Sequence, residues 1–152
     1  MNRDLRWYDH LTLNSYWLGL NTASGIITPL LLPALVVLYM PVEYKNTYLA
    51  TVSTLGLAVA MLVQPIAGML SDRSTARLGR RRPFILVGAL LNSVFLAVIG
   101  LSKSFTNSPL DAALMPALGF TAAYGVLLLG IVLLQVSSNI GHGALQGLIP
   151  DL

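Results

Sequence analysis

Four long stretches without a charged side chain dominate this sequence and restrict what it can fold into. They run from Leu11 to Val42, from Asn46 to Ser71, from Pro83 to Ser102 and from Ala112 to Pro150. Each is long enough for the roughly 20 residues with which a helix crosses about 30 Å of hydrocarbon. Backbone polar groups in lipid must be satisfied within the segment, and the period-two alternation of a membrane barrel is absent. The pattern therefore predicts an all-α membrane protein with four transmembrane helices.

The composition agrees with a membrane protein. Only 10% of the residues are charged and 55% are apolar, whereas about 25% of the residues of a soluble domain are charged. The net charge of +3 is concentrated in one short loop, which favours a role in membrane orientation over nucleic-acid binding. There is no cysteine, which excludes disulfides and cysteine-based metal sites. We expect no cofactor.

The spans can be placed approximately from the apolar runs. We expect them at about residues 13–40, 48–70, 84–101 and 117–146, with a loop at residues 71–83. Pro29 and Pro33 should interrupt the first span, because proline removes a backbone donor and its ring disturbs the preceding turn. Tyr39, Tyr44 and Tyr48 surround the loop that follows this span. They are typical of an aromatic belt at the membrane interface.

The distribution of lysine and arginine predicts the orientation. The side of the membrane that holds the N-terminus and the 71–83 loop carries Arg3, Arg6, Arg73, Arg77, Arg80, Arg81 and Arg82, and the opposite side carries Lys45 and Lys103. Cytoplasmic segments carry the excess of positive residues. We therefore expect a cytoplasmic N-terminus and a cytoplasmic 71–83 loop, in a plasma or inner membrane.

The stretch Gly68–Pro83, "GMLSDRSTARLGRRRP", holds more than a topology signal. Orientation alone requires arginines but neither an acid nor glycines. Gly68 would let a neighbouring helix approach closely, and Asp72 could accept charge-assisted hydrogen bonds from the arginines or from a helix N-terminus. The stretch therefore predicts a clasp that holds two helical bodies together in one state and releases them in another.

This stretch resembles the loop between helices two and three of major facilitator superfamily transporters. Its long spacer and the following proline resemble the glycoside–pentoside–hexuronide cation symporters and the sucrose–proton symporters. "VQP" at Val63–Pro65 and the tail "GIVLLQVSSNIGHGALQGLIPDL" are similar to the sucrose type. The resemblance implies a gating motif formed by Gly68, Asp72, Arg73, Gly79, Arg80 and Arg81.

The resemblance also implies the place of the chain in a larger fold. That fold has twelve helices in two six-helix halves, which rock about a central site. Residues 1–152 would correspond to helices 1–4, a partial N-terminal half that needs the remaining helices as partners. We expect such a chain to be inactive by itself.

Polar side chains within the spans indicate where a substrate would lie. Span one carries Asn14, Asn21, Ser24 and Thr28 on one helical stripe, and span four carries Gln135, Ser138, Asn139, His142 and Gln146. From these positions and from Gln64 we predict a substrate cavity lined by Asn21, Gln64, Gln135, Asn139, His142 and Gln146. The alternative is that these side chains hydrogen-bond neighbouring helices together. Span three has only Asn92 and Ser93, and the resemblance implies that this helix packs outside the central path.

Neutral amides and hydroxyls suit a sugar, which offers many hydrogen-bonding groups and no charge. The resemblance, however, also reveals two departures. In the sucrose-type symporters, the position of Gln135 carries an aspartate associated with proton coupling, and that of Gln146 carries an arginine associated with substrate. The sequence therefore leaves open coupling to a proton or a sodium ion through other residues, facilitated diffusion, or a different small polar solute.

Two other classes of four-helix membrane protein are possible. A small dimeric exporter of cations would need an acid inside span one, where only Asp9 lies at the margin. A four-helix assembly subunit would need no cavity. An enzyme is disfavoured because there is no paired carboxylate, and His10 and His142 lie in different segments. We therefore expect a transporter or facilitator of a sugar or another small polar solute that works by alternating access.

Overall fold

The computed structural model describes residues 7–75 and 79–148. Within these residues every regular element is helical, and four helical runs are long and apolar enough to cross a membrane. The elements are α1 (Trp7–Ile26), the π-helical turn η1 (Ile27–Leu31), α2 (Leu32–Tyr39), the 3-10 turn η2 (Val42–Tyr44), α3 (Lys45–Arg73), α4 (Arg82–Leu101), the 3-10 turn η3 (Ser102–Phe105), α5 (Asp111–Leu118) and α6 (Ala122–Leu148). The prediction of an all-α membrane protein with four spans is confirmed.

The first span is one long helical run with a π-helical turn in its middle. The turn, η1, contains Pro29, and Pro33 follows within the first turn of α2. Because a proline cannot donate a backbone hydrogen bond and crowds the carbonyl four residues before it, the regular α pattern is replaced by a wider turn. The interruption expected at the two prolines therefore widens the helix without ending it.

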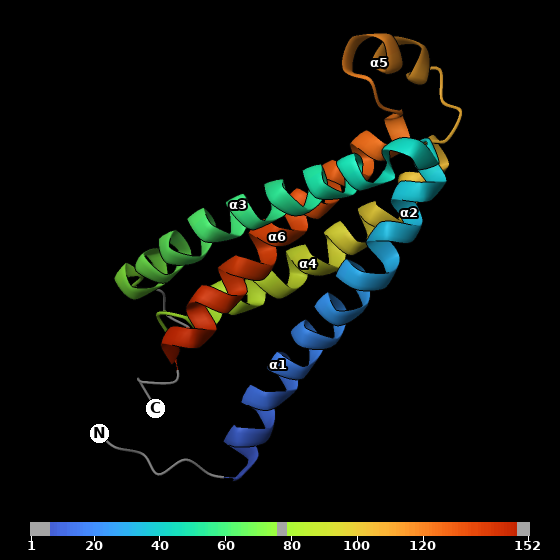
Figure 1. The fold of residues 1–152 in the computed structure, drawn as a ribbon. Helices are drawn as coiled ribbons and strands as arrows, with labels where there is room; N and C mark the ends of the chain where they lie inside the picture. Colours follow the sequence, from blue (N-terminus) through green and yellow to red (C-terminus); the bar gives the residue numbers. More distant parts are fainter. Residues whose placement is uncertain (1–6, 76–78, 149–152) are drawn as a thin grey trace.

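Helix α6 is the central helix of the bundle. In its apolar window 44% of the residues are buried, against 11–17% in the other three spans. It packs against both α3 and α4, as Figure 1 shows. The contact with α4 is close at Gly88, where a Cβ would lie 2.9 Å from both Ser137 O and Gly141 N. Glycine therefore allows the two helix backbones to meet at this crossing.

Helix α6 begins later than the sequence suggests. Its expected start near residue 117 lies in α5, which ends at Leu118 and is followed by Gly119 with a positive φ of 76°. The backbone N–H of Ala122 donates to Asp111 Oδ1 at 2.7 Å, and that of Tyr124 donates to Thr121 Oγ1 at 3.2 Å. These two acceptors satisfy donors in the first turn of α6, so the helix starts at Ala122.

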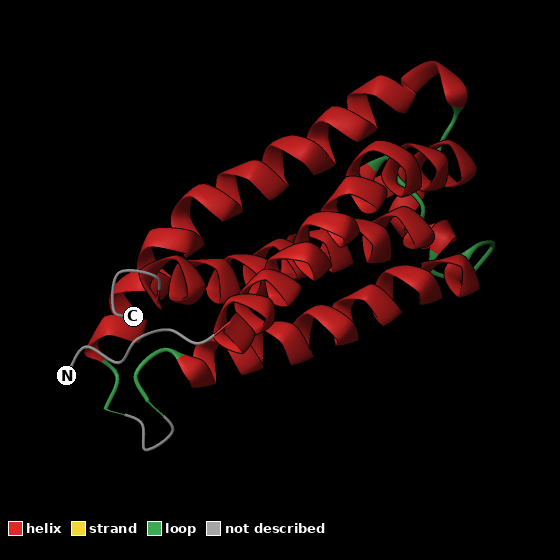
Figure 2. Ribbon diagram, turned by 90° about the horizontal axis from the view of Figure 1, so that it is seen from below, coloured by secondary structure: helices red, strands yellow, loops and turns green. Residues whose placement is uncertain are grey.

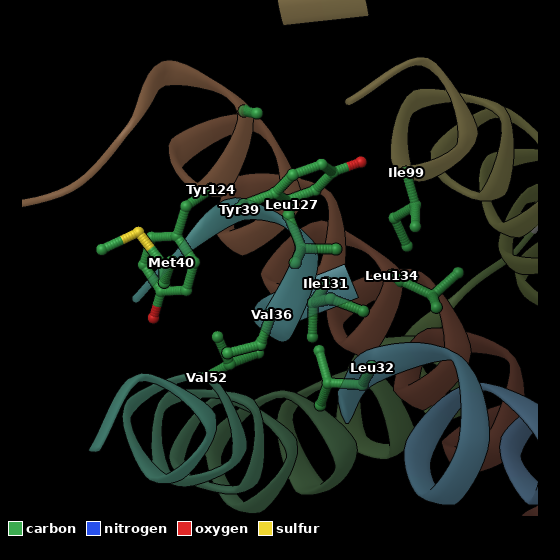
Figure 3. Close-up of a cluster of buried hydrophobic side chains, with 11 residues drawn as sticks. Leu32, Val36, Tyr39, Met40, Val52, Ile99, Tyr124, Leu127, Ile131 and Leu134 are labelled. Atoms are coloured by element: carbon green, nitrogen blue, oxygen red, sulfur yellow. The ribbon is translucent and has the colours of Figure 1, made fainter. Parts of the chain in front are cut away.

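Of the three tyrosines expected at the interface, Tyr39 is buried in the core and Tyr48 is half-buried against it. Tyr39 is buried and its hydroxyl lies 2.9 Å from the buried Ser102 Oγ. The ring of Tyr48 packs edge-on against Tyr124, whose hydroxyl donates to Tyr48 O at 2.9 Å. Figure 3 shows the buried cluster of α2, α3, α4 and α6 that contains Tyr39 and Tyr124. Only Tyr44 of the three is well exposed.

The two ends of the bundle differ in charge. One end holds the start of α1, the end of α3, the start of α4 and the end of α6, as Figures 1 and 2 show. We call it the arginine end, because it carries Arg73, Arg80, Arg81 and Arg82. The opposite end holds η2, η3 and α5, with Lys45 and Lys103. Arg3, Arg6 and Arg77 lie outside the described residues.

Candidate functional site

A cavity of about 140 Å³ lies inside the bundle, between the first span and the other three helices. Its lining combines branched apolar side chains with six neutral polar ones: Ser24, Thr28, Ser53, Asn92, Gln135 and Ser138. Among the described residues that line it, none is an Asp, Glu, His, Lys or Arg. The cavity can therefore offer hydrogen bonds from hydroxyl and amide groups without presenting a charge.

A π-helical turn of the first span and a glycine of α3 lie at the cavity wall. The π-helical turn η1 contributes Ile27 and Thr28 to the cavity wall. On the facing side, a Cβ at Gly56 of α3 would lie 3.4 Å from both Cγ and Nε2 of Gln135. Gly56 therefore lies within ordinary packing distance of the Gln135 side chain, between α3 and α6.

Asn92 links α4 to α6 at the cavity. Its Oδ1 lies 2.7 Å from the Ser137 hydroxyl and 2.8 Å from the Ser138 hydroxyl. Asn92 and Ser138 both line the cavity. The third span was expected to pack outside the central path, but it contributes this polar side chain to the wall.

The structure distributes the six predicted cavity residues over several places. Gln135 lines the cavity, and Asn139 is buried one turn further on, where its Nδ2 donates to Gln135 O at 2.8 Å. Asn21 donates to Trp17 O at 2.8 Å and lines a shallow pocket with Asn14 on α1. Of the six, Gln135 is the one that lines the described part of the cavity.

The remaining three predicted residues lie nearer the arginine end. His142 packs against Trp17 with ring centroids 4.9 Å apart, which joins α6 to α1. Gln64 Nε2 donates to Gln146 Oε1 at 2.8 Å, which joins α3 to α6. Gln64 and Gln146 thus hydrogen-bond two neighbouring helices together, which is the alternative to lining a substrate cavity.

The described part of the predicted clasp contains an ion pair between Asp72 and Arg81. Arg81 Nη2 lies 2.6 Å from Asp72 Oδ1, so the residue before α4 is tied to the last turn of α3. The Asp72 side chain is 54% exposed and that of Arg81 only 10%. Because the guanidinium is largely removed from water, its charge-assisted hydrogen bond to the carboxylate is stronger than an exposed pair would be.

Helix α6 supports this ion pair through a glycine. A Cβ at Gly147 would overlap the guanidinium group of Arg81. The Arg81 side chain therefore passes directly over the last turn of α6 on its way to Asp72. Gly79 precedes it with a positive φ of 99°, a conformation that favours glycine. Three helices thus meet at this ion pair.

The other residues of the predicted gating motif lie at the end of α3 and before the start of α4. Arg73, at the end of α3, and Arg80 are both exposed. Gly68 lies at the crossing of α3 with α6, where a Cβ at Gly143 would be 2.7 Å from Gln64 O and 3.1 Å from Gly68 N. An open groove of about 540 Å³ runs over Gln64, Gly68, Asp72, Arg81, Gln146 and their glycine neighbours. This groove, the clasp groove, is distinct from the internal cavity.

The cavity contains polar residues that the predicted set omits. Ser53, Asn92 and Ser138 line it, together with Ser24 and Thr28 of the polar stripe on the first span. Asn92 and Ser138 were visible as polar positions in apolar spans, but their pairing across two helices was not. Among the described residues, no group of three His, Asp or Glu side chains could hold a metal ion.

Comparison with known proteins matches residues 15–140 to the family described as MFS/sugar transport protein. Similar curated proteins include sucrose transport protein SUT3 of Oryza sativa subsp. indica, 35% identical over 101 residues that make up 64% of this chain and 20% of the relative. Sucrose transport protein SUC3 of Arabidopsis thaliana is 34% identical over 101 residues, 64% of this chain and 17% of the relative. The chain thus spans about a fifth of the length of these relatives. No solved structure matches it.

Proposed function

Because the chain belongs to the MFS/sugar transport protein family, we propose that its four membrane-spanning helices form one side of the translocation path of a sugar transporter. The family is one of transporters rather than of enzymes. The observation that carries this proposal is the internal cavity, whose polar lining consists of neutral hydroxyl and amide groups. A sugar presents hydroxyl groups that both donate and accept, so such a lining matches it without the cost of burying a charge.

We propose that helices beyond these four complete the sugar site. The cavity of about 140 Å³ is small, because pockets that enclose a small-molecule ligand usually measure about 300–1,000 Å³. Transporters of this architecture bind substrate near the middle of the membrane, at the interface between their repeats. We therefore expect liposomes that contain only residues 1–152 to take up no sugar above the rate of empty liposomes.

The arginine end is proposed to face the cytoplasm. It carries Arg73, Arg80, Arg81 and Arg82, whereas the opposite end carries two lysines. The excess of positive charge marks the side that is not translocated during insertion. In this orientation, within a plasma or inner membrane, the clasp groove lies at the cytoplasmic surface.

The ion pair between Asp72 and Arg81 is proposed to stabilise one state of an alternating-access cycle. Replacing Asp72 by Asn removes a charge-assisted hydrogen bond from a guanidinium that is only 10% exposed. Such bonds contribute about 1.5–3 kcal/mol, and 1.4 kcal/mol already changes a two-state equilibrium tenfold. We expect Asp72→Asn to reduce sugar uptake about tenfold in a longer version of the protein that carries the remaining helices of the family fold.

Two further variants make this test specific. Glu43→Gln removes an acid at the opposite end of the bundle and should leave uptake unchanged. The exchange of both charges, Asp72→Arg with Arg81→Asp, should restore part of the lost uptake, because the attraction is re-formed with opposite sign. Uptake by Asp72→Asn equal to that of the unaltered protein would contradict the clasp.

The group that couples transport to an ion, whether proton or sodium, is proposed to lie on helices beyond these four. The described cavity lining has no ionisable side chain, and His142 lies outside that lining, against Trp17. We expect His142→Gln to keep the ratio of uptake rates measured with and without an inward proton gradient. A ratio that falls to one only in the variant would assign proton coupling to His142. A ratio of one in both proteins would indicate facilitated diffusion.

A further inference from the structure

An apolar groove of about 370 Å³ opens between α3 and α4 on the surface of the bundle. Its walls are Val63, Ile66, Ala67 and Leu70 of α3 and Pro83, Phe84 and Val87 of α4, with Ile140 of α6. Ile66, Leu70 and Val87 are each about half exposed. The groove is therefore an apolar channel on the surface of the four-helix bundle, formed mainly by two helices that are long and apolar enough to cross a membrane.

Two exposed arginines stand where this groove reaches the arginine end. Arg73 follows Leu70 by three residues on α3, so both lie on one helix face. Arg82 directly precedes Pro83 at the start of α4. Both side chains are exposed. The surface thus changes from apolar to cationic along the groove, at the point where the apolar runs of α3 and α4 stop.

We propose that this groove binds an anionic phospholipid. One acyl chain lies along the apolar walls, and the phosphate group is held by Arg73 and Arg82. Arginine presents donors in a fork that matches two phosphate oxygens. Basic pockets between helices at the membrane surface bind anionic headgroups, and each Lys or Arg near an anionic lipid surface strengthens the attraction by a factor of about five.

The lining favours a lipid over another helix at this surface. Close helix crossings in membranes use small residues, and in this chain these crossings are directed at α6, through Gly88 against Gly141 and through Gly143 against Gln64. The groove between α3 and α4 has Ala67 as its one small described lining residue and otherwise bulky side chains. A flexible acyl chain fills such a channel, and an anionic headgroup complements the two arginines.

Native mass spectrometry of the 152-residue chain in detergent tests the proposal, with phosphatidylglycerol and phosphatidylcholine of identical acyl chains as probes. We expect the phosphatidylglycerol adduct to be the tighter one. The double variant Arg73→Gln/Arg82→Gln should weaken it about 25-fold, since two arginines each contribute a factor of about five. The matched double variant Lys45→Gln/Lys103→Gln removes the same charge at the other end and should change it less than twofold.

A third variant tests the groove itself. Val87→Trp fills the channel and should weaken both lipids alike, because their acyl chains are identical. Circular dichroism verifies that each variant keeps its helicity. Equal binding of the two lipids, equal effects of the arginine and lysine variants, or unchanged binding by Val87→Trp would each overturn the proposal. A dimer of the chain that Val87→Trp dissociates would also overturn it, by assigning the groove to a second copy.

Discussion

Replacing Gly143 by Ala is expected to lower the free energy of unfolding by about 2–3 kcal/mol, the upper part of the range for overpacked cores. A Cβ at this position would lie 2.7 Å from Gln64 O and 3.1 Å from Gly68 N. Both atoms belong to the backbone of α3, so no side chain can turn aside. The helices α3 and α6 must separate, which also lengthens the hydrogen bond between Gln64 and Gln146.

Two alanine variants serve as controls for this prediction. At Gly68, on the other side of the same crossing, a Cβ would meet Gly143 O at an ordinary 4.0 Å, and at Gly100 it would meet nothing within 4 Å. Because alanine favours helix more than glycine does, these variants should be as stable as the unaltered chain or more stable. The measurement is loss of helicity during detergent denaturation. Equal losses for Gly143→Ala and Gly68→Ala would contradict the crossing geometry.

The sequence predicted the helical spans well because length and apolarity alone decide whether a segment crosses a membrane. It predicted less well where side chains determine local structure. The start of α6 depends on Asp111, eleven residues earlier, whose carboxylate accepts from Ala122 N. Tyr39 and Tyr48 resembled interface residues by their position near a loop, but their packing in and against the core depends on Ser102 and Tyr124, far along the chain.

The sequence indicated which types of residue to expect at the candidate site, but it did not indicate which side chains contact one another. The Gly68–Pro83 motif indicated a clasp, and an ion pair forms there, yet nothing in the sequence distinguished Arg81 from its neighbours as the partner of Asp72. Polar residues in apolar spans indicated a polar interior. Gln135 and Gln146 lie on the same face of α6, because eleven residues make about three helical turns, but they are about 16 Å apart along its axis. Gln135 therefore lines the cavity, whereas Gln146 bonds to Gln64 nearer the arginine end.

This separation leads to the second large effect. Gln135→Leu is expected to weaken sugar binding about 30-fold in the longer version that carries the remaining helices. Leucine keeps most of the side-chain volume but removes an amide from the cavity wall. A sugar hydroxyl that loses its partner inside the site is left without a hydrogen bond, at a cost of about 1–3 kcal/mol. The midpoint of that range corresponds to the stated factor.

Gln146→Leu provides the matched control for this effect. Both substitutions replace a glutamine of α6 by leucine, but Gln146 is exposed and bonds to Gln64 in the clasp groove. Sugar affinity should change less than twofold in this variant. The uptake rate of Gln146→Leu can still fall, because the clasp groove is proposed to affect the transport cycle rather than the affinity of the sugar site.

Calorimetric titration of the longer version with a sugar that it transports therefore compares the two glutamines directly. We expect Gln135→Leu to raise the dissociation constant for the sugar about 30-fold. Gln146→Leu should leave this constant little changed. Equal dissociation constants for the two variants, or a larger effect of Gln146→Leu, would contradict the assignment of the sugar path to the cavity between the first span and α3, α4 and α6.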